Sequence, residues 1–437
     1  MLAVQRRELR FGAPSGSGAA TPRISSGGIL PRRLARIERG FILGSGRHCY
    51  FLSHARVDAS WRKIESVPPM RGEIAALCVI PNGEPRTQKC PDAWLLGVTD
   101  EFGFLVLAWI RAEELQLDPS TASDVDIYAR NVEIVCCNPS SFGRLVETHS
   151  PSFVSLHGNA TACSETRAVV ANRAAGCVSI TDGSAQIIRV LFPLALPSGD
   201  AQFVNHGSGS NVLVVLEGAA WSQWDLRVAE RKGMVSREAP NGFGTFGCAL
   251  YAVDSSGTDG HRIMVGGEQR EALLYDSRNT RGVLSRWASC VQHDITWLRQ
   301  ISRGPCDSAS STPDVVLVAG AHNELALGAW DVQNAARLRQ DIAANIENEG
   351  QKLQDRLDPS DSGADPANRK AFNLSWSLGG AQAMQSGSLV LNDNRVLTKR
   401  TDERIVGLTC QQVKDSTVLD HQLSVLTHSN VMYELQC

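Results

Sequence analysis

The feature that most limits what this chain can fold into is a repeated unit of two short apolar runs separated by a turn. In one clear copy, residues 212–216 turn at Glu217-Gly218 into a second run that ends in Trp224-Asp225. Short apolar runs on either side of a tight turn are typical of a β-hairpin rather than of a helix. The aspartates that close the four clear copies, 43, 51 and 55 residues apart, are Asp182, Asp225, Asp276 and Asp331.

Three weaker hairpins extend the series to seven, at residues 41–52, 94–109 and 423–435. Apolar segments precede the hairpins and are suited to be further strands, as at residues 74–80, 248–253 and 295–298. A unit that recurs in this way favours a closed all-β repeat fold, because each added unit extends the same core. We therefore predict an all-β fold, a seven-bladed β-propeller with one inserted amphipathic helix.

These residues resemble the WD-repeat family. Two copies carry the Trp-Asp dipeptide literally, at Trp224-Asp225 and Trp330-Asp331, and the segment 293–297 (HDITW) is similar to the His-led strand entry of that family. The resemblance covers residues 40–437 and is closest over 160–335, although the usual Gly-His pair is missing from every copy. It implies blades of four strands and structural roles for His293 and Trp330. We expect Trp330 to be buried between blades.

The order of the hairpins also resembles the small-propeller nucleoporins of the nuclear pore outer ring, the Y-complex. The chain ends in a strand, a turn and a strand, with no closing strand after them. In that family an N-terminal strand closes the ring, and either residues 29–37 or residues 4–11 are suited to that role here. Closure matters because an open propeller leaves unpaired strand edges.

The predicted domain organisation is one propeller over residues 29–437, preceded by a flexible arm or closing strand at 1–28 and interrupted by an insertion at 332–370. Residues 1–37 are rich in Arg, Ser and Gly, with Glu8 as their one acid. That composition fits an organelle transit peptide, and the alternative is a flexible arm. No stretch approaches the roughly 18 apolar residues of a membrane span, so we expect no membrane insertion.

Residues 332–358 break the strand pattern. Apolar side chains at helical spacing, with charged residues between them, predict an amphipathic helix that Gly350 weakens. A flexible loop is expected at 359–366. One interpretation is a helix that packs on the propeller's own side, and the other is a helix that docks into a partner. The candidate docking residues are Leu338, Ile342, Ile346, Leu353 and Leu357.

Motifs that carry chemistry are absent from the sequence. It has no phosphate-binding loop, dinucleotide fingerprint, nucleophile elbow or His-Glu-x-x-His pair, and its twelve cysteines form no C-x-x-C pair. The cysteines are typical of small core side chains in a reducing compartment. With 43 Lys+Arg against 46 Asp+Glu, nucleic acid is not expected as the main partner. We predict no catalytic residue, no cofactor, no metal and no small-molecule substrate.

Three functions remain open from the sequence. The first is a protein-interaction scaffold, specifically a nucleoporin-like subunit of a large assembly, located inside the cell at the nucleus or nuclear envelope or in the cytoplasm. The second is a substrate receptor of a cullin-RING ubiquitin ligase, because Trp224-Asp225-Leu226-Arg227 resembles the W-D-x-R ending of the adaptor-binding box. The residues before it, 217–221, depart from that box. The third is a propeller enzyme whose site is built from blade loops.

Overall fold

The computed structural model describes the repeated strands and many of the turns that join them. The described residues are 4–11, 24, 30–54, 60–65, 67–81, 93–101, 104–111, 132–134, 153–157, 167–172, 176–182, 187–195, 197–204, 211–228, 232–240, 249–255, 261–280, 282–288, 290–291, 293–301, 315–321, 325–329, 382–383, 389–390, 405–412, 421–428 and 430–436.

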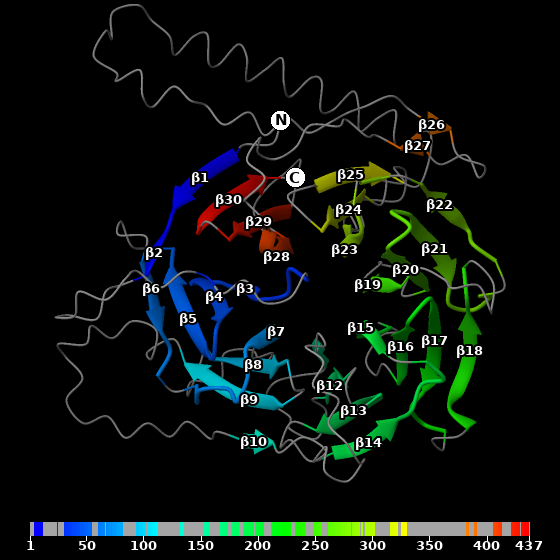
Figure 1. Ribbon diagram of the computed structural model, residues 1–437, viewed down its shortest axis with the longest axis horizontal. Coiled ribbons are helices and arrows are strands. Elements are labelled where there is room, and N and C mark those ends of the chain that lie inside the picture. The colour runs from blue at the N-terminus through cyan, green and yellow to red at the C-terminus, as the bar shows by residue number, and fades with distance from the viewer. Residues whose placement is uncertain are drawn as a thin grey trace, which may run out of the picture.

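Most of the described residues are in β-strands, which form several sheets arranged around a common centre, as in a β-propeller (Figure 1). Within each main sheet, strands that follow one another in the chain pair antiparallel, so the predicted hairpins are present. In the first sheet β2 (Arg10–Phe11) is added in parallel to β6 (Ser60–Lys63). The strands of the first three sheets are β2 (Arg10–Phe11), β3 (Leu34–Ile37), β4 (Gly40–Ser45), β5 (His48–Ser53) and β6 (Ser60–Lys63); β7 (Ile74–Pro81), β8 (Ala93–Asp100), β9 (Leu105–Arg111) and β10 (Val132–Ile134); and β11 (Phe153–His157), β12 (Arg167–Asn172), β13 (Cys177–Asp182) and β14 (Ile187–Leu191).

The remaining sheets continue around the ring, and a small two-stranded sheet lies outside the series. Their strands are β15 (Pro197–Phe203), β16 (Val212–Glu217), β17 (Ala220–Asp225) and β18 (Met234–Glu238); β19 (Leu250–Asp254), β20 (Arg262–Gly267), β21 (Ala272–Asp276) and β22 (Ser285–Trp287); β23 (Ile295–Ile301), β24 (Val315–Gly320) and β25 (Leu325–Ala329); β28 (Ile405–Gln412), β29 (His421–Thr427), β30 (Val431–Gln436) and β1 (Val4–Glu8); and the small pair β26 (Gln382–Ala383) and β27 (Leu389–Val390).

The middle strands are buried on both faces, because each sheet packs between two neighbours. In β16 the residues from Leu213 to Glu217 are all buried, and β17 is buried from Ala220 to Trp224. This explains why these segments are continuous apolar runs rather than alternating ones. The turn between β16 and β17 uses Gly218 at φ +56°, a conformation that suits glycine because it lacks a Cβ.

The aromatic residues that precede the repeat aspartates Asp225 and Asp276 are buried. Trp224 is 5% exposed and packs with apolar residues of the preceding sheet, including Val169 and Ile180. Tyr275 is 2% exposed, with its ring centroid 5.0 Å from that of Trp221 on the neighbouring sheet. The expectation for Trp330 stays a prediction, because Trp330 lies outside the described residues.

The two ends of the chain meet in one sheet. β1 pairs antiparallel with β30, from Val4 opposite Leu435 to Glu8 opposite Val431. The other candidate for closure was wrong, since Leu34–Ile37 is instead the strand β3, which pairs with β4. Both segments have the local hydrophobicity of a β-strand. They differ only in the strand with which they pair, β30 for β1 and β4 for β3.

Asn430 fixes this closure. Its backbone oxygen accepts a hydrogen bond from the Leu9 amide at 3.0 Å, and its side-chain amide donates to the Leu9 oxygen at 2.8 Å. Its Oδ1 also accepts a hydrogen bond from Trp61 Nε1 at 2.9 Å. Asn430 therefore joins the N-terminal strand to the first and last sheets of the ring, and Leu9 is buried among apolar residues of both.

Candidate functional site

The candidate docking helix lies outside the described residues, as do all five of its apolar positions and the loop predicted at 359–366. His293 is exposed just before β23, and its predicted structural role stays a prediction. Two regions that the sequence did not single out are the centre of the ring and an outer arc over β14, β18 and β22.

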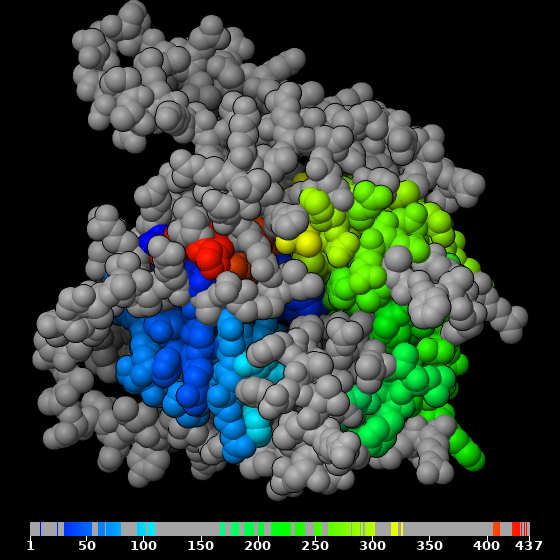
Figure 2. All heavy atoms as spheres, in the orientation of Figure 1, coloured from blue at the N-terminus to red at the C-terminus, as the bar shows by residue number. Residues whose placement is uncertain are grey.

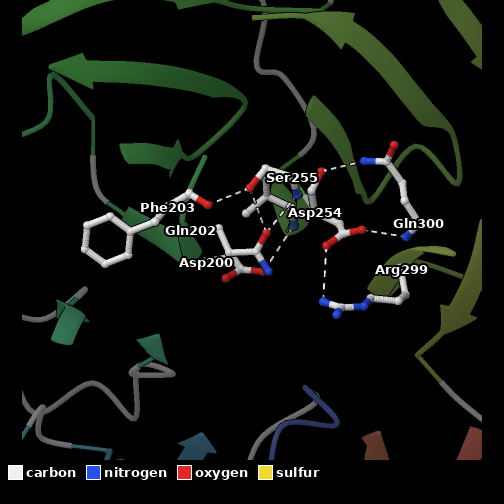
Figure 3. Close-up of polar contacts among 8 residues, drawn as sticks. Asp200, Gln202, Phe203, Asp254, Ser255, Arg299 and Gln300 are labelled. Carbon is white, nitrogen blue, oxygen red and sulfur yellow. Dashed lines mark hydrogen bonds and ion pairs between the residues drawn. The ribbon is translucent and has the colours of Figure 1, made fainter. Parts of the chain in front are cut away.

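Carboxylates on the inner strands connect successive sheets around the centre. Asp200 on β15 accepts a hydrogen bond from the Val253 amide of β19 at 3.1 Å. Asp254 on β19 accepts one from the Gln300 amide of β23 at 2.5 Å, and Gln300 Nε2 donates to the Asp254 backbone oxygen at 3.0 Å (Figure 3). The same relation therefore holds between two successive pairs of sheets, with an inner-strand Asp bound to the next inner strand.

A second contact strengthens the first of these joints. The Ser255 amide donates to Gln202 Oε1 at 2.8 Å, and its hydroxyl donates to the Phe203 backbone oxygen at 2.8 Å (Figure 3). Asp200, Asp254 and Ser255 are all buried. These hydrogen bonds matter because a polar group that is buried without a hydrogen-bond partner destabilises the fold.

Arg32 reaches across the centre of the ring. It precedes β3, and its Nη2 lies 2.9 Å from Asp200 Oδ2, with both side chains 8% exposed. The same nitrogen donates to the Tyr251 backbone oxygen at 2.5 Å. Burial lowers the pKa of Arg32, and the charge of Asp200 counteracts this. The ion pair therefore links the first sheet of the ring to two sheets on another side of it.

Burial raises the pKa of Asp200 to about 6, against the opposing effects of Arg32 and the Val253 amide. Between pH 3.8, its ordinary pKa, and pH 6, the folded chain holds a proton that the unfolded chain has released. The contribution of Asp200 to stability is therefore present at low pH and is lost as the pH rises through the folded-state pKa.

The variant Asp200→Asn removes this titration. We expect the free energy of unfolding of the wild type, relative to the variant, to fall by roughly 2 kcal/mol between pH 4 and pH 7. Urea unfolding of both proteins across this pH range measures the difference. Parallel pH profiles would show that Asp200 titrates normally in the folded chain.

A cavity of about 530 Å³ occupies the centre of the ring, within the usual size range of ligand pockets. Its apolar wall includes Ile37, Trp94 and Trp297. Its polar lining includes arginines, acids and thiols: Arg32, Arg36, Glu38, Cys78, Asp200, Gln202, Arg299, Thr409 and Cys410. The lining comes from the inner strands β3, β7, β15, β19, β23 and β28, with Trp94 from β8.

The buried thiols are poor nucleophiles. Burial raises the pKa of Cys410 to about 11 and that of Cys49 to about 12, and it raises the pKa of Cys290 further. Since the thiolate is the reactive form, these three cysteines are protonated and unreactive near neutral pH. Within the part of the chain that the structure describes, His, Cys, Asp and Glu form no group that can hold a metal ion.

The described segments include no helix that is long and apolar enough to span a membrane.

Two successive sheets end their third strand in the same Asp-x-Arg turn. After β17, Arg227 donates from its amide and Nε to Asp225 Oδ1, at 2.9 and 3.0 Å, and from Nη2 to Oδ2 at 2.8 Å. After β21, Arg278 binds Asp276 in the same way, at 2.9, 2.9 and 2.7 Å. These hydrogen bonds lower the pKa of Asp225 and bring that of Asp276 to about 2. Both arginines stay about two-thirds exposed, at 69% and 66%.

The outer arc is a set of exposed apolar side chains on or beside the outer strands of three neighbouring sheets. Among the described residues, the large hydrophobic side chains that are exposed all lie there. Figure 2 shows the green residues of these sheets side by side along one edge of the molecule. The arc consists of Ile188, Phe192 and Leu194 at and after β14, Val228 after β17, Val235 on β18, and Val283 and Leu284 before β22.

Buried hydrogen bonds hold the backbone under this arc in place. Glu217, which is fully buried, accepts hydrogen bonds from the amides of Leu194 and Ala195 at 3.1 and 3.3 Å. Thr280 donates to Glu238 at 3.0 Å and so joins the turn before β22 to β18. The arc is therefore a supported surface that spans several sheets.

Comparison with known proteins agrees with the fold. No protein-family model matches the sequence, and no curated protein matches it. A chain in a crystal structure of the mitotic checkpoint complex is similar at 10% identity and a TM-score of 0.52, over 99% of this chain and 93% of that chain. Raptor from Chaetomium thermophilum is similar at 11% identity and a TM-score of 0.51, over 94% of this chain and 28% of that chain. Both are β-propeller proteins, and at these identities the likeness shows the fold alone.

Proposed function

We propose that the chain is a propeller scaffold that holds other protein chains together and catalyses no reaction. The observation that carries this proposal is the outer arc. Its side chains are up to 68% exposed, at Leu194, and they gather on three neighbouring sheets instead of being scattered. Exposed apolar side chains that gather on one side of a protein, over a supported backbone, are typical of a protein-interaction site. Burial of this surface against a partner removes it from water, which favours association.

Charged substitutions in the arc test this proposal. Val235 is 62% exposed on β18 and Leu284 is 50% exposed before β22, so neither supports the core. We expect Val235→Asp and Leu284→Asp, combined, to weaken binding to the native partners at least tenfold, because they place charge in an apolar interface. Quantitative pull-down of tagged protein from the source organism measures this loss.

The melting temperature provides the control for that experiment. It should change little in the double variant, since both side chains are exposed. A matched variant outside the arc, Arg270→Asp at the turn between β20 and β21, should retain the partners. Full retention of the partners by the arc variant would contradict the proposal.

The finer proposal is that this scaffold is a structural subunit of a large assembly, specifically a nucleoporin-like subunit of the nuclear pore outer ring. The feature that supports it is the closure of the last sheet by β1, which resembles the closure described above for the small-propeller nucleoporins. The corresponding location is the nuclear envelope, with the cytoplasm as the alternative. We propose protein subunits as partners, without a small-molecule substrate, and nucleic acid is not proposed as the main partner.

We also propose that the ring has seven blades. In this arrangement residues 29–437 form one propeller with an insertion at 332–370, and the segment 1–28 supplies the closing strand. Seven sheets of three or more strands support this count among the described residues. The insertion, with its helix, is proposed from the sequence pattern alone.

A second candidate function is that of a substrate receptor in a cullin-RING ubiquitin ligase. The observation that favours it is the turn at Trp224-Asp225-Leu226-Arg227, in which Asp225 fixes an exposed guanidinium. The same turn at Asp276–Arg278 shows that the geometry also serves as a local turn lock, which supports a structural role equally well. The composition of the native assembly separates the two candidates: pore subunits in one case, a ligase adaptor in the other.

A further inference from the structure

Arg36 lines the central cavity from β3. It is half-buried, and its Nη1 atom is buried and donates no hydrogen bond. Its guanidinium carbon lies 5.5 Å from the centre of the Phe41 ring, which orients the group. Glu434 acts on Arg36 electrostatically, but the described part of the chain places no carboxylate in an ion pair with it.

Arg299 reaches the same part of the cavity from β23. It is 40% exposed, and its Nη1 lies 3.5 Å from Asp254 Oδ1, longer than the 2.7–2.9 Å of a strong charge-assisted hydrogen bond (Figure 3). Arg36 on β3 and Arg299 on β23 each act electrostatically on the thiol of Cys410, which lies on β28. Both arginines line the cavity, and so does Thr409, which has a side-chain hydroxyl group.

Carboxylates balance part of this charge, since the buried Asp254 is ion-paired with Arg299 at 3.5 Å and Glu434 acts on Arg36 electrostatically. Arg32 is paired with Asp200 at 2.9 Å, so these two residues neutralise each other. Glu38 lies on the exposed part of the lining. The same lining includes Trp94, Trp297 and Leu298. The cavity thus combines two arginines, whose guanidinium groups carry several N–H donors, with aromatic and aliphatic residues.

We propose that this cavity binds a ligand in which an oxyanion, a carboxylate or a phosphate, is attached to a flat apolar group. Arg36 and Arg299 bind the oxyanion, because guanidinium groups present several N–H donors in one plane and match its geometry. The indole-lined wall packs against the apolar group. This site is separate from the outer arc, so it does not depend on the scaffold function.

Small probes of opposite charge test the site on the purified full-length chain. Benzoate and phenyl phosphate carry the two oxyanions on the same ring, and benzamidine has the shape of benzoate with a positive charge. Isothermal titration calorimetry should detect benzoate or phenyl phosphate with a Kd in the millimolar range or below. Benzamidine should bind at least tenfold more weakly. The stronger of the two anions identifies the carboxylate or the phosphate as the preferred group.

Substitutions locate the binding. Arg36→Gln and Arg299→Gln should each weaken the preferred anion at least tenfold, and Arg36→Lys should retain part of the affinity. Arg278→Gln, on the outer edge of the ring, is the matched control and should bind as the wild type does. Thermal melting shows which variants fold. If Arg36→Gln does not fold, Arg299→Gln and Arg36→Lys still locate the site. Equal binding of benzamidine, unchanged affinity in the folded variants, or no heat from either anion up to 10 mM would overturn the proposal.

Discussion

Deletion of residues 1–11 should destabilise the whole ring, by about 5 kcal/mol or more. The deletion removes β1 from the edge of β30. It also removes Leu9, which is 5% exposed, and so exposes the apolar side chains that pack against Leu9. It also removes the two hydrogen bonds that join Leu9 to Asn430. An unpaired β30 edge is in addition a site for strand pairing between molecules, so we expect the variant to aggregate on heating. Chemical unfolding and light scattering measure the two effects.

A shorter deletion is the control. Removal of residues 1–3 leaves β1 intact, since the strand begins at Val4. This variant should unfold at the same denaturant concentration as the full chain. Equal stability of the full chain and the variant without residues 1–11 would mean that the ring does not need its N-terminal strand.

Replacement of Arg32 by Ala should cost about 3–5 kcal/mol at pH 7, because it leaves the buried carboxylate of Asp200 without its opposite charge. The cost should be smaller at pH 5, where Asp200 can take up a proton in the folded state. Urea unfolding at the two pH values measures both results. An equal cost at pH 5 and pH 7 would indicate lost packing of the Arg32 side chain rather than an uncompensated charge.

Two further variants complete this test. The double replacement Arg32→Met and Asp200→Leu removes both charges and should recover much of the stability, as is common for buried ion pairs. Arg227→Ala also removes an arginine from an ion pair, but that guanidinium is exposed, so little change is expected. A double variant as unstable as Arg32→Ala would contradict the account of this pair.

The propeller arrangement was predictable because its signal is local. Each hairpin is a continuous apolar run, a turn and a second run, as in β16, Gly218 and β17. The aspartates at 182, 225 and 276 each end a third strand, as their spacing predicted. Burial on both faces of these strands makes the pattern strong. The sequence left two candidate segments for the closing strand. The choice between them depends on the pairing of β1 with β30, which lies at the opposite end of the chain.

The central cavity was not predictable from the sequence. Arg32 lies in a Pro-Arg-Arg segment that has no feature to distinguish it from a solvent-exposed basic stretch, and Asp200 is far away in the chain. Only the closure of the ring brings the two together. The turn at Asp276–Arg278 did have a signal, since it repeats the spacing of Asp225 and Arg227. The insertion at 332–370 has the clearest helical pattern, yet it lies outside the described residues and stays a prediction.

The mass of the native assembly tests the scaffold function most directly. The chain alone has a mass of 47.2 kDa. Native mass spectrometry of the tagged protein, purified from its source organism, should show a larger particle in which other subunits are present at fixed stoichiometry. The variant with Val235→Asp and Leu284→Asp should lose at least one of those subunits while staying folded. A folded wild-type protein found only at the mass of the single tagged chain would contradict the account.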